Sequence, residues 1–373
     1  MVKISSILLF LLVLTLDGPA YAAPKLEIIH SGERKWELLL ADLEQASSSI
    51  CLEYYSFADD NSGREVRDVL VRKAREGVPV RLIVENVVHG FASRRFFTEM
   101  KKAGVEVRYF TDLDRWDAIS GIDCRDHRKI VVIDSRIGYL GGMNLTDDYH
   151  YHWRDTHLRL EGTSVAQLEH IFHRMWVALG GSGAQEDLPS FQPDDGIEIV
   201  AGGPAYPIFV KKYLQALQTA RAYAYLETPY FCPPDTLVSA LQTAASRGVD
   251  VRIIIPEKTD HGFMDLANQS FFPELLEAGI RIYEYLPRFD HSKVFLFDDA
   301  QCWIGSVNFD NRSLYLDYEV CACIYDVATI IAQKSCFLDL LRECRELSAT
   351  EAAIRSKGQR FREKLVRLLE SQL

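Results

Sequence analysis

The chain has 373 residues, of which 48% are apolar and 25% are charged, and its formal net charge is −11. This composition excludes a disordered or fibrous protein, and the length allows two domains, each with a core of its own. The acidic charge also argues against a non-specific nucleic-acid binder, which usually presents a basic face.

The N-terminus has the pattern of a secretory signal peptide. Lys3 precedes the apolar run 7–14, and Ala20-Tyr21-Ala22 has the small-x-small pattern of a cleavage site. The apolar run is too short to cross a bilayer comfortably. We therefore expect a signal peptide at residues 1–22 and an exported protein, periplasmic or secreted, with an uncleaved N-terminal anchor as the alternative.

Strand and helix patterns alternate twice along the rest of the chain. Such an internal repeat predicts two α/β halves, each with a mixed or largely parallel sheet flanked by helices. The first half has strand patterns at 49–57, 78–84 and 105–110, and the second repeats them at 224–231, 249–255 and 280–283.

The domain boundaries follow from this repeat. We place the first half at residues 24–185 and the second at 197–348, with a linker rich in Gly, Ser, Pro and Asp at 180–196. The first half also carries an insertion at 111–126, which we expect to form a loop at the mouth of the site. Residues 349–373 form a basic amphipathic C-terminal helix in this prediction.

One motif of polar residues occurs twice, and all of its matching positions are separated by the same constant offset along the chain. Each copy is His-x-Lys-x4-Asp, followed by Gly-[Gly/Ser]-x-Asn. The residues between Lys and Asp are apolar, which predicts a buried strand with His and Lys on one face. Two copies in fixed register indicate a duplicated catalytic half-site. The copies comprise His127, Lys129, Asp134 and Asn144 in the first half and His291, Lys293, Asp298, Ser306 and Asn308 in the second.

These residue types are suited to phosphoryl transfer. A histidine can act as nucleophile or as general acid and base, because its ordinary pKa is about 6.5. A lysine on the same face supplies a fixed cation for a phosphate oxygen, and Asn144 and Asn308 add neutral donors. The small residues of the turns, Ser306 among them, allow a substrate to approach the backbone. Such a site needs no metal and no cofactor.

Two carboxylates are candidates for orienting the histidines. Asp155 follows His127 at the same spacing at which Glu319 follows His291. A histidine that acts through one ring nitrogen needs the other nitrogen held, usually by a carboxylate. We therefore expect Asp155 and Glu319 to be the orienting acids.

Four further carboxylates need a role. Asp134 and Asp298 complete the motifs, and we expect them to be structural, as hydrogen-bond acceptors at the end of each strand. Glu53 and Glu227 each stand inside an apolar strand pattern, where a carboxylate is unusual and normally paired. These two glutamates either line the site and support the histidines or form structural ion pairs.

At these residues the chain resembles the phospholipase D superfamily, whose signature is two His-x-Lys-x4-Asp motifs that meet at a pseudo-twofold interface. It is most similar to the bacterial cardiolipin synthases, in the stretch from His127 to Asn144 and in Glu227-Thr228-Pro229-Tyr230-Phe231. The resemblance covers about residues 25–345. It implies two duplicated phospholipase D-like α/β halves with the active site at their interface.

The resemblance also implies a reaction in two steps. One histidine attacks a phospholipid phosphorus to form a phosphohistidine, while the other protonates the departing alcohol and then deprotonates an incoming alcohol or water. In much of the superfamily the first-motif histidine is the nucleophile. The resemblance thus assigns that role to His127 and the acid–base role to His291, with the reverse assignment sterically open.

The leading prediction is a phosphatidyltransferase of the cardiolipin-synthase type, which acts on phosphatidylglycerol or a similar phospholipid. The alternatives are a phospholipase D that releases phosphatidic acid, a secreted nuclease or phosphodiesterase, and a non-catalytic lipid-binding protein. Acidic charge and the lack of a basic, aromatic-interleaved patch favour lipid over nucleic acid. Family synthases are commonly anchored by N-terminal helices or lie at the cytoplasmic face, so the export signal is a departure from their pattern.

A phospholipid substrate requires contact with a membrane, and we expect that contact to be peripheral. The C-terminal helix either lies on an anionic surface or docks on its own domain, and the sequence pattern assigns no oligomeric state. The cysteines show no regular disulfide framework. Four of them lie in apolar strand patterns and are expected to be buried thiols, with one or two disulfides as the alternative: Cys51, Cys302, Cys321 and Cys323.

Overall fold

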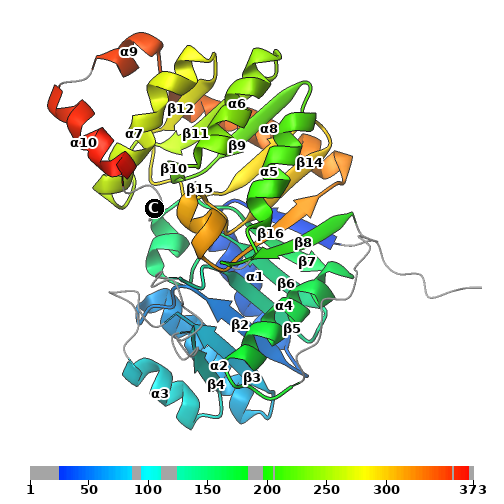
Figure 1. The fold of residues 1–373 in the computed structure, drawn as a ribbon. Helices are drawn as coiled ribbons and strands as arrows, with labels where there is room; N and C mark the ends of the chain where they lie inside the picture. The colour runs from blue at the N-terminus through cyan, green and yellow to red at the C-terminus, as the bar shows by residue number, and fades with distance from the viewer. Residues whose placement is uncertain are drawn as a thin grey trace, which may run out of the picture.

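The computed structural model describes residues 25–85, 94–110, 124–183, 196–204, 206–354 and 357–368. The predicted signal peptide lies outside these ranges, as do most of the predicted loop at 111–126 and most of the predicted linker at 180–196. The described residues form two α/β halves, which are stacked one above the other in Figure 1.

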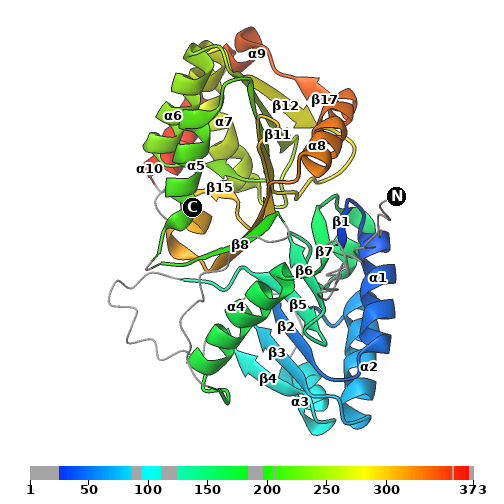
Figure 2. The ribbon, with the colours of Figure 1, turned by 90° about the vertical axis from the view of Figure 1, so that its right-hand side faces the viewer.

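The first half is built on one mixed sheet. Within the described residues, its seven strands lie in the order β1-β7-β6-β5-β2-β3-β4. Strands β2, β3 and β4 are parallel, and the other neighbours are antiparallel. Helices α1, α2 and α3 cover one face of the sheet and α4 covers the other (Figure 2). The elements are β1 (Lys25–Ile29), α1 (Gly32–Gln45), β2 (Ile50–Tyr54), α2 (Asn61–Arg75), β3 (Val80–Val84), α3 (Arg94–Lys102), β4 (Glu106–Tyr109), β5 (Lys129–Ile133), β6 (Ile137–Gly141), the π-helical turn η3 (Asp148–His152), β7 (His157–Glu161) and α4 (Ser164–Ala178).

The second half has a sheet of eight described strands, in the order β17-β12-β11-β9-β13-β14-β16-β8, and β10 pairs separately with β15. Helices α5, α6 and α7 lie on one face and α8 on the other (Figure 2). The elements are β8 (Ile197–Gly202), α5 (Ile208–Thr219), β9 (Tyr223–Glu227), β10 (Phe231–Cys232), α6 (Asp235–Ser246), β11 (Asp250–Pro256), α7 (Gly262–Glu277), β12 (Arg281–Tyr285), β13 (Val294–Phe297), β14 (Gln301–Gly305), β15 (Phe309–Asp310), the π-helical turn η4 (Arg312–Leu316), β16 (Glu319–Ile324), α8 (Val327–Leu340), the 3-10 turn η5 (Leu341–Glu343), β17 (Cys344–Glu346), α9 (Ala349–Ala353) and α10 (Lys357–Leu368).

The two sheets follow one plan, which confirms the predicted duplication of an α/β half. The strand order from β1 to β4 matches the order from β8 to β12, and β17 is added at the far edge of the second sheet. In each sheet the motif strand, β5 or β13, lies between β2 and β6 or between β9 and β14. Every residue of β2, β5, β9 and β13 is buried. Burial on both faces explains why these strands have nearly continuous apolar sequences instead of alternating ones.

A shared apolar core joins the halves. It includes Leu158 and Trp176 of the first half and Ile304 and Phe337 of the second, all of them buried. Strand β6 of the first half also contacts β14 and β16 of the second. The interface that carries the motifs is therefore packed like the interior of one domain.

The C-terminal helix α10 docks on α7, as the second of the two alternatives predicted. Val366 is buried, and Arg367 forms an ion pair with Glu274 and lies 3.9 Å from the ring centre of Phe271. No described helix is both long and apolar enough to span a bilayer. All eight cysteines are free thiols, and the four in strand patterns are buried as predicted.

Candidate active site

Hydrogen bonds between the halves bring the two motif histidines to one interface. The backbone N–H of His127 donates to the carbonyl of Tyr318 at 2.9 Å, and that of His291 donates to the carbonyl of Arg154 at 2.7 Å. Tyr318 and Arg154 directly precede Glu319 and Asp155. The segment that carries each histidine therefore runs beside the segment that carries the acid of the other half.

The orienting acids are exchanged between the halves. Nδ1 of His127 lies 2.8 Å from Oε1 of Glu319, and Nδ1 of His291 lies 2.8 Å from Oδ2 of Asp155. The equal spacing in the sequence pointed to these two acids but did not assign either one to a histidine. Because Nδ1 is held, Nε2 of each ring is the nitrogen left for chemistry.

The motif lysines lie against the histidines. Each Nζ donates to the carbonyl of its motif histidine, at 2.6 Å, and Nζ of Lys293 also lies 3.0 Å from Nε2 of His291. Burial lowers the pKa of Lys129 to about 7 and that of Lys293 to about 8, although carboxylates nearby raise both values. Each lysine thus loses its proton far more readily than an exposed lysine does.

Burial also dominates the titration of the histidines and their acids. It lowers the pKa values of His127 and His291 well below the ordinary value, and the two lysines lower them further. It raises the pKa of Glu319 to about 8 and that of Asp155 to about 7, against the attraction of the lysines. An entering phosphate brings negative charge into this desolvated cluster and favours the cationic forms of lysine and histidine.

The Gly-[Gly/Ser]-x-Asn turns differ between the halves. Ser306 donates a hydrogen bond from Oγ to Glu319 and accepts one from the backbone of Val320 at 3.0 Å. The matching residue in the first half is Gly142, and a Cβ there would lie 2.2 Å from Oδ1 of Asp155. One half therefore holds its acid with a hydroxyl, whereas the other has room for its acid because the side chain is absent.

The two motif asparagines are both buried. Oδ1 of Asn144 accepts from the backbone N–H of Ser56 at 3.1 Å. Oδ1 of Asn308 has no hydrogen-bond partner among the described residues. A buried amide oxygen without a partner costs free energy, so Asn308 is the asparagine with capacity to accept a hydrogen bond from a substrate.

Glu53 and Glu227 form buried ion pairs, the structural alternative of the two predicted. Glu53 lies 2.5 Å from Arg128, which also pairs with Asp126 at 3.0 Å. Glu227 pairs with Arg154, a residue of the first half. Glu53 and Glu227 lie on β2 and β9, the strands next to the motif strands, and each pairs with a buried arginine there.

The arginines of these two ion pairs come from different positions of the repeat. Arg128 stands between His127 and Lys129, and the matching residue of the second half is Ser292. Arg154 fills the vacated place, with Nη1 at 2.8 Å from Asp290 and 3.0 Å from Ser292. The residue that matches Arg154 is Tyr318, whose ring lies 5.3 Å from the guanidinium of Arg128. Each histidine thus has one buried arginine near it, and the first half supplies both arginines.

Asp134 and Asp298 lie at the other end of the motif strands, about 17 Å from the motif lysines at the rise of a strand. Asp298 accepts backbone N–H bonds from Arg221, Ala222 and Tyr223 at 2.8 to 2.9 Å. Asp134 does the same for residues 47–49, and although burial opposes it, these bonds lower its pKa well below the ordinary value. The two aspartates are therefore remote from the histidines and lysines with which the motif groups them. Their hydrogen bonds to backbone N–H groups agree with the predicted structural role.

Three residues at the site were not anticipated from the sequence. Tyr149 lies with its hydroxyl 3.4 Å from Nε2 of His291. Lys35 is fully buried and donates to the carbonyls of Met143 at 3.1 Å and Asn144 at 3.3 Å, and burial lowers its pKa well below the ordinary value. The sequence contains one signal for Arg154, which directly precedes the predicted acid Asp155. It contains none for Lys35, because a lysine in a helix is normally exposed.

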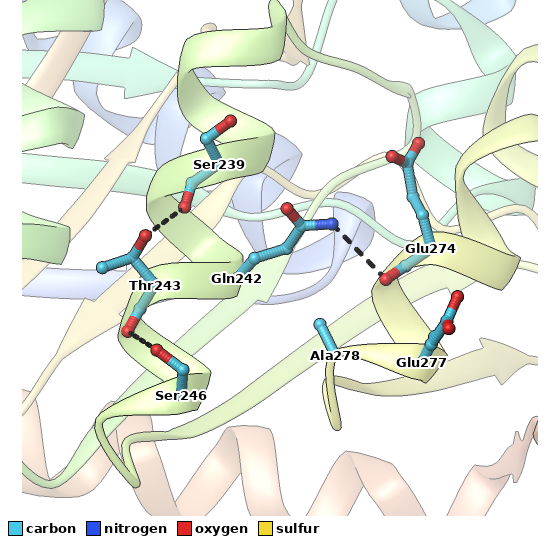
Figure 3. Close-up of a pocket in the computed structure, with 7 residues that line it drawn as sticks. All are labelled: Ser239, Gln242, Thr243, Ser246, Glu274, Glu277 and Ala278. Atoms are coloured by element: carbon cyan, nitrogen blue, oxygen red, sulfur yellow. Dashed lines mark hydrogen bonds between the residues drawn. The ribbon is translucent and has the colours of Figure 1, made fainter.

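A shallow groove of about 490 Å³ lies between α6 and α7 (Figure 3). Gln242 crosses it and donates to the carbonyl of Glu274 at 3.4 Å. The lining residues include none of the predicted site residues, so the groove is separate from the histidine pair. They are Ser239, Gln242, Thr243, Ser246, Glu274, Glu277 and Ala278.

The fold and the paired motifs define an α/β enzyme of the phospholipase D superfamily. The family model described as "Cardiolipin synthase, PLD-like domain" matches residues 39–176 and 213–338. Cardiolipin synthase 2 of Bacillus anthracis is 37% identical over 354 residues, which cover 91% of this chain and 69% of the relative. The major cardiolipin synthase of Bacillus subtilis is 34% identical, with 92% and 74% covered. The crystal structure of phosphatidylserine synthase from Haemophilus influenzae superposes with a TM-score of 0.74 at 16% identity, over 93% of this chain and 95% of that one.

The chain belongs to the cardiolipin synthase family. It is a phosphatidyltransferase of the cardiolipin-synthase type, as the resemblance of its motifs implied.

The predicted export of the protein is wrong. The chain belongs to a family whose bacterial synthases are membrane-bound and typically lie on the cytoplasmic side, and this family membership does not support export. The prediction of export was based on the apolar run 7–14 after Lys3 and on the small-x-small pattern Ala20-Tyr21-Ala22. Hydropathy registers apolar character alone and does not distinguish an export signal from other apolar segments.

Proposed function

We propose that the enzyme transfers a phosphatidyl group from phosphatidylglycerol to the hydroxyl of an alcohol acceptor, a second phosphatidylglycerol in the simplest case, through a phosphohistidine. The observation that carries the proposal is the exchanged pairing of His127 with Glu319 and of His291 with Asp155. This pairing leaves two Nε2 atoms for the reaction at one interface. Two histidines of this kind provide a nucleophile and a separate proton carrier.

In the first step, Nε2 of His127 attacks the phosphorus and forms a P–N bond. The P–O bond to the departing alcohol breaks, and His291 donates its Nε2 proton to that oxygen. We assign the nucleophile to His127 because its side chain is 12% exposed, against 5% for His291, and an attacking nitrogen must reach a substrate. The first-motif position agrees with the pattern of the superfamily.

In the second step, His291 takes the proton of the acceptor hydroxyl, whose oxygen attacks the phosphorus. The P–N bond breaks and its electron pair returns to Nε2 of His127, so the enzyme is regenerated. Lys129 and Lys293 stabilise the charge on the phosphoryl oxygens in both steps, together with the amides of Asn144 and Asn308.

We also propose peripheral contact with the bilayer that contains the substrate. Phe263, in the first turn of α7, is 39% exposed. Nearby Asp260 accepts a hydrogen bond from Tyr230, whose ring centre lies 6.2 Å from that of His291. An exposed aromatic side chain close to the site suits contact with lipid headgroups, and co-sedimentation with phosphatidylglycerol vesicles measures this contact.

The function is tested by incubating the full-length protein with phosphatidylglycerol vesicles, with and without glycerol, and separately with single-stranded DNA. We expect cardiolipin as the product, and both His127→Ala and His291→Ala should abolish its formation. His173→Ala, on the outer helix α4, is the matched control and should keep full activity. Phosphatidic acid as the sole product would replace transfer with hydrolysis, and cleaved DNA with intact lipid would overturn the lipid assignment.

The assignment of the nucleophile has its own test. Trapping the intermediate in alkali, where a P–N bond survives, and mapping the modified peptide should place the adduct at His127. An adduct at His291 would reverse the two roles.

A further inference from the structure

The two π-helical turns occupy matching places but carry different residues beside the site. Turn η3 (Asp148–His152) and turn η4 (Arg312–Leu316) each follow a motif asparagine, and they are separated by the same offset as the two motifs. Tyr149 of η3 corresponds to Ser313 of η4. The serine side chain hydrogen-bonds to Glu319 and so helps to hold the acid of His127. The tyrosine, by contrast, contacts the histidine His291 itself.

Tyr149 is directed at the reactive nitrogen of His291. Its hydroxyl lies 3.4 Å from Nε2, and its ring packs edge-on against the imidazole with centres 5.1 Å apart. The ring is 6% exposed and also packs against Trp153, with centres 4.7 Å apart. Burial raises the pKa of Tyr149 well above the ordinary value, so the hydroxyl remains a donor at neutral pH.

A hydrogen-bond donor at this place can distinguish one class of alcohol from others as the group that receives the phosphatidyl group. Since the Tyr149 hydroxyl lies 3.4 Å from Nε2 of His291, an alcohol that gives its proton to this nitrogen can have its neighbouring atoms within reach of that hydroxyl. A glycerol-type headgroup carries a second oxygen on the adjacent carbon, which can accept from Tyr149 while the first oxygen attacks. Water and simple monoalcohols have one oxygen, so they cannot make both contacts at separate points.

We propose that Tyr149 is an acceptor-binding residue that selects vicinal diols, such as the glycerol headgroup, over monoalcohols and water. This inference rests on the proposed function, in which His291 takes the proton of the acceptor. Tyr149 makes this contact only at His291, because the matching residue Ser313 is hydrogen-bonded to Glu319, the acid of His127. Tyr149 thereby favours transfer to the alcohol over hydrolysis by water in the second step.

The test is a competition between isotope-labelled glycerol and 1-propanol for the same phosphatidyl-enzyme, in which labelled phosphatidylglycerol is counted as the product of glycerol and phosphatidic acid as the product of water. In Tyr149→Phe the ring and its packing remain and the hydroxyl is lost. We expect the ratio of labelled phosphatidylglycerol to phosphatidylpropanol to fall about tenfold, the effect of one hydrogen bond, and the share of phosphatidic acid to rise. Because the products form in one sample, the ratio does not depend on the fraction of active protein.

Tyr151→Phe is the matched control, because Tyr151 lies in the same turn, is 46% exposed and stacks on His150. It should leave the product ratio unchanged. A ratio within twofold of the parent enzyme in Tyr149→Phe would overturn the inference while transfer itself persists. A parent enzyme that transfers to neither alcohol would overturn the proposed function instead.

Discussion

Replacing Gly142 with alanine should disable the acid of His291 without straining the backbone. The backbone at Gly142 lies outside the left-handed region that favours glycine, so alanine can adopt it. The added Cβ, however, would lie 2.2 Å from Oδ1 of Asp155 and 2.5 Å from Oδ2. The loop cannot easily retreat, because the N–H of Gly142 donates to the carbonyl of Thr156 at 3.1 Å.

The expected loss of activity follows from the hydrogen bond to His291 that the carboxylate of Asp155 must give up. Asp155 has to move by about 1 Å to reach ordinary contact with the new methyl group, and its 2.8 Å bond to Nδ1 of His291 breaks or weakens. A hydrogen bond to a charged group contributes about 1.5–3 kcal/mol, which corresponds to a loss of about 10- to 100-fold in kcat. The assay is steady-state formation of cardiolipin from phosphatidylglycerol vesicles.

The control for Gly142→Ala is Gly262→Ala at the start of α7, where a Cβ meets no atom within 4 Å. This variant should have the kcat of the parent enzyme. Thermal unfolding of both variants separates a displaced acid from a misfolded chain. If Gly142→Ala kept kcat within twofold, the carboxylate of Asp155 would not need its present position, and its role as the orienting acid of His291 would be refuted.

Two more predictions concern charge. The pKa of Lys129 is lowered to about 7, so the cation that holds a phosphoryl oxygen is lost as the pH rises through that value, and kcat/KM should decline above it. Lys129→Arg, whose side chain stays charged, should move the decline to higher pH in the pH–rate profile, and an unmoved profile would exclude Lys129 as its source. Arg128→Met leaves Glu53 and Asp126 buried without their cation, which should destabilise the fold by about 3–5 kcal/mol in thermal unfolding. Adding Glu53→Gln should restore part of the loss, and an unchanged Tm in the single variant would contradict the ion-pair role.

Much of the fold could be predicted because the repeat and the buried strands leave direct marks on the sequence. The continuous apolar run of residues 130–133 marks a strand buried on both faces, and β5 includes it. The predicted strand at 49–57 is shorter in the structure, at Ile50–Tyr54, because residues beyond Tyr54 turn away to form the connection to α2. The exact end of a strand or helix depends on local backbone hydrogen bonds, and the periodicity of apolar residues does not show these.

The site was predictable in its composition but not in its connections. The repeat identifies Asp155 and Glu319 as matching acids, yet an offset within one half cannot show that each acid reaches across to the other half. The role of Lys35 could not be predicted either, because burial of a lysine depends on tertiary packing against Met143 and Asn144. Contacts between elements far apart in the chain are absent from a sequence pattern.

Arg128 and Arg154 both belong to the first half, so the second half depends on the first for the cation that pairs with Glu227 and Asp290. In a symmetric dimer of the second half, Ser292 and Tyr318 would stand beside Asp290 and Glu227, and neither would supply a cation. A symmetric dimer of the first half would place Arg128 and Arg154 together where the structure has one arginine. Only one copy of each half gives one buried arginine beside each histidine.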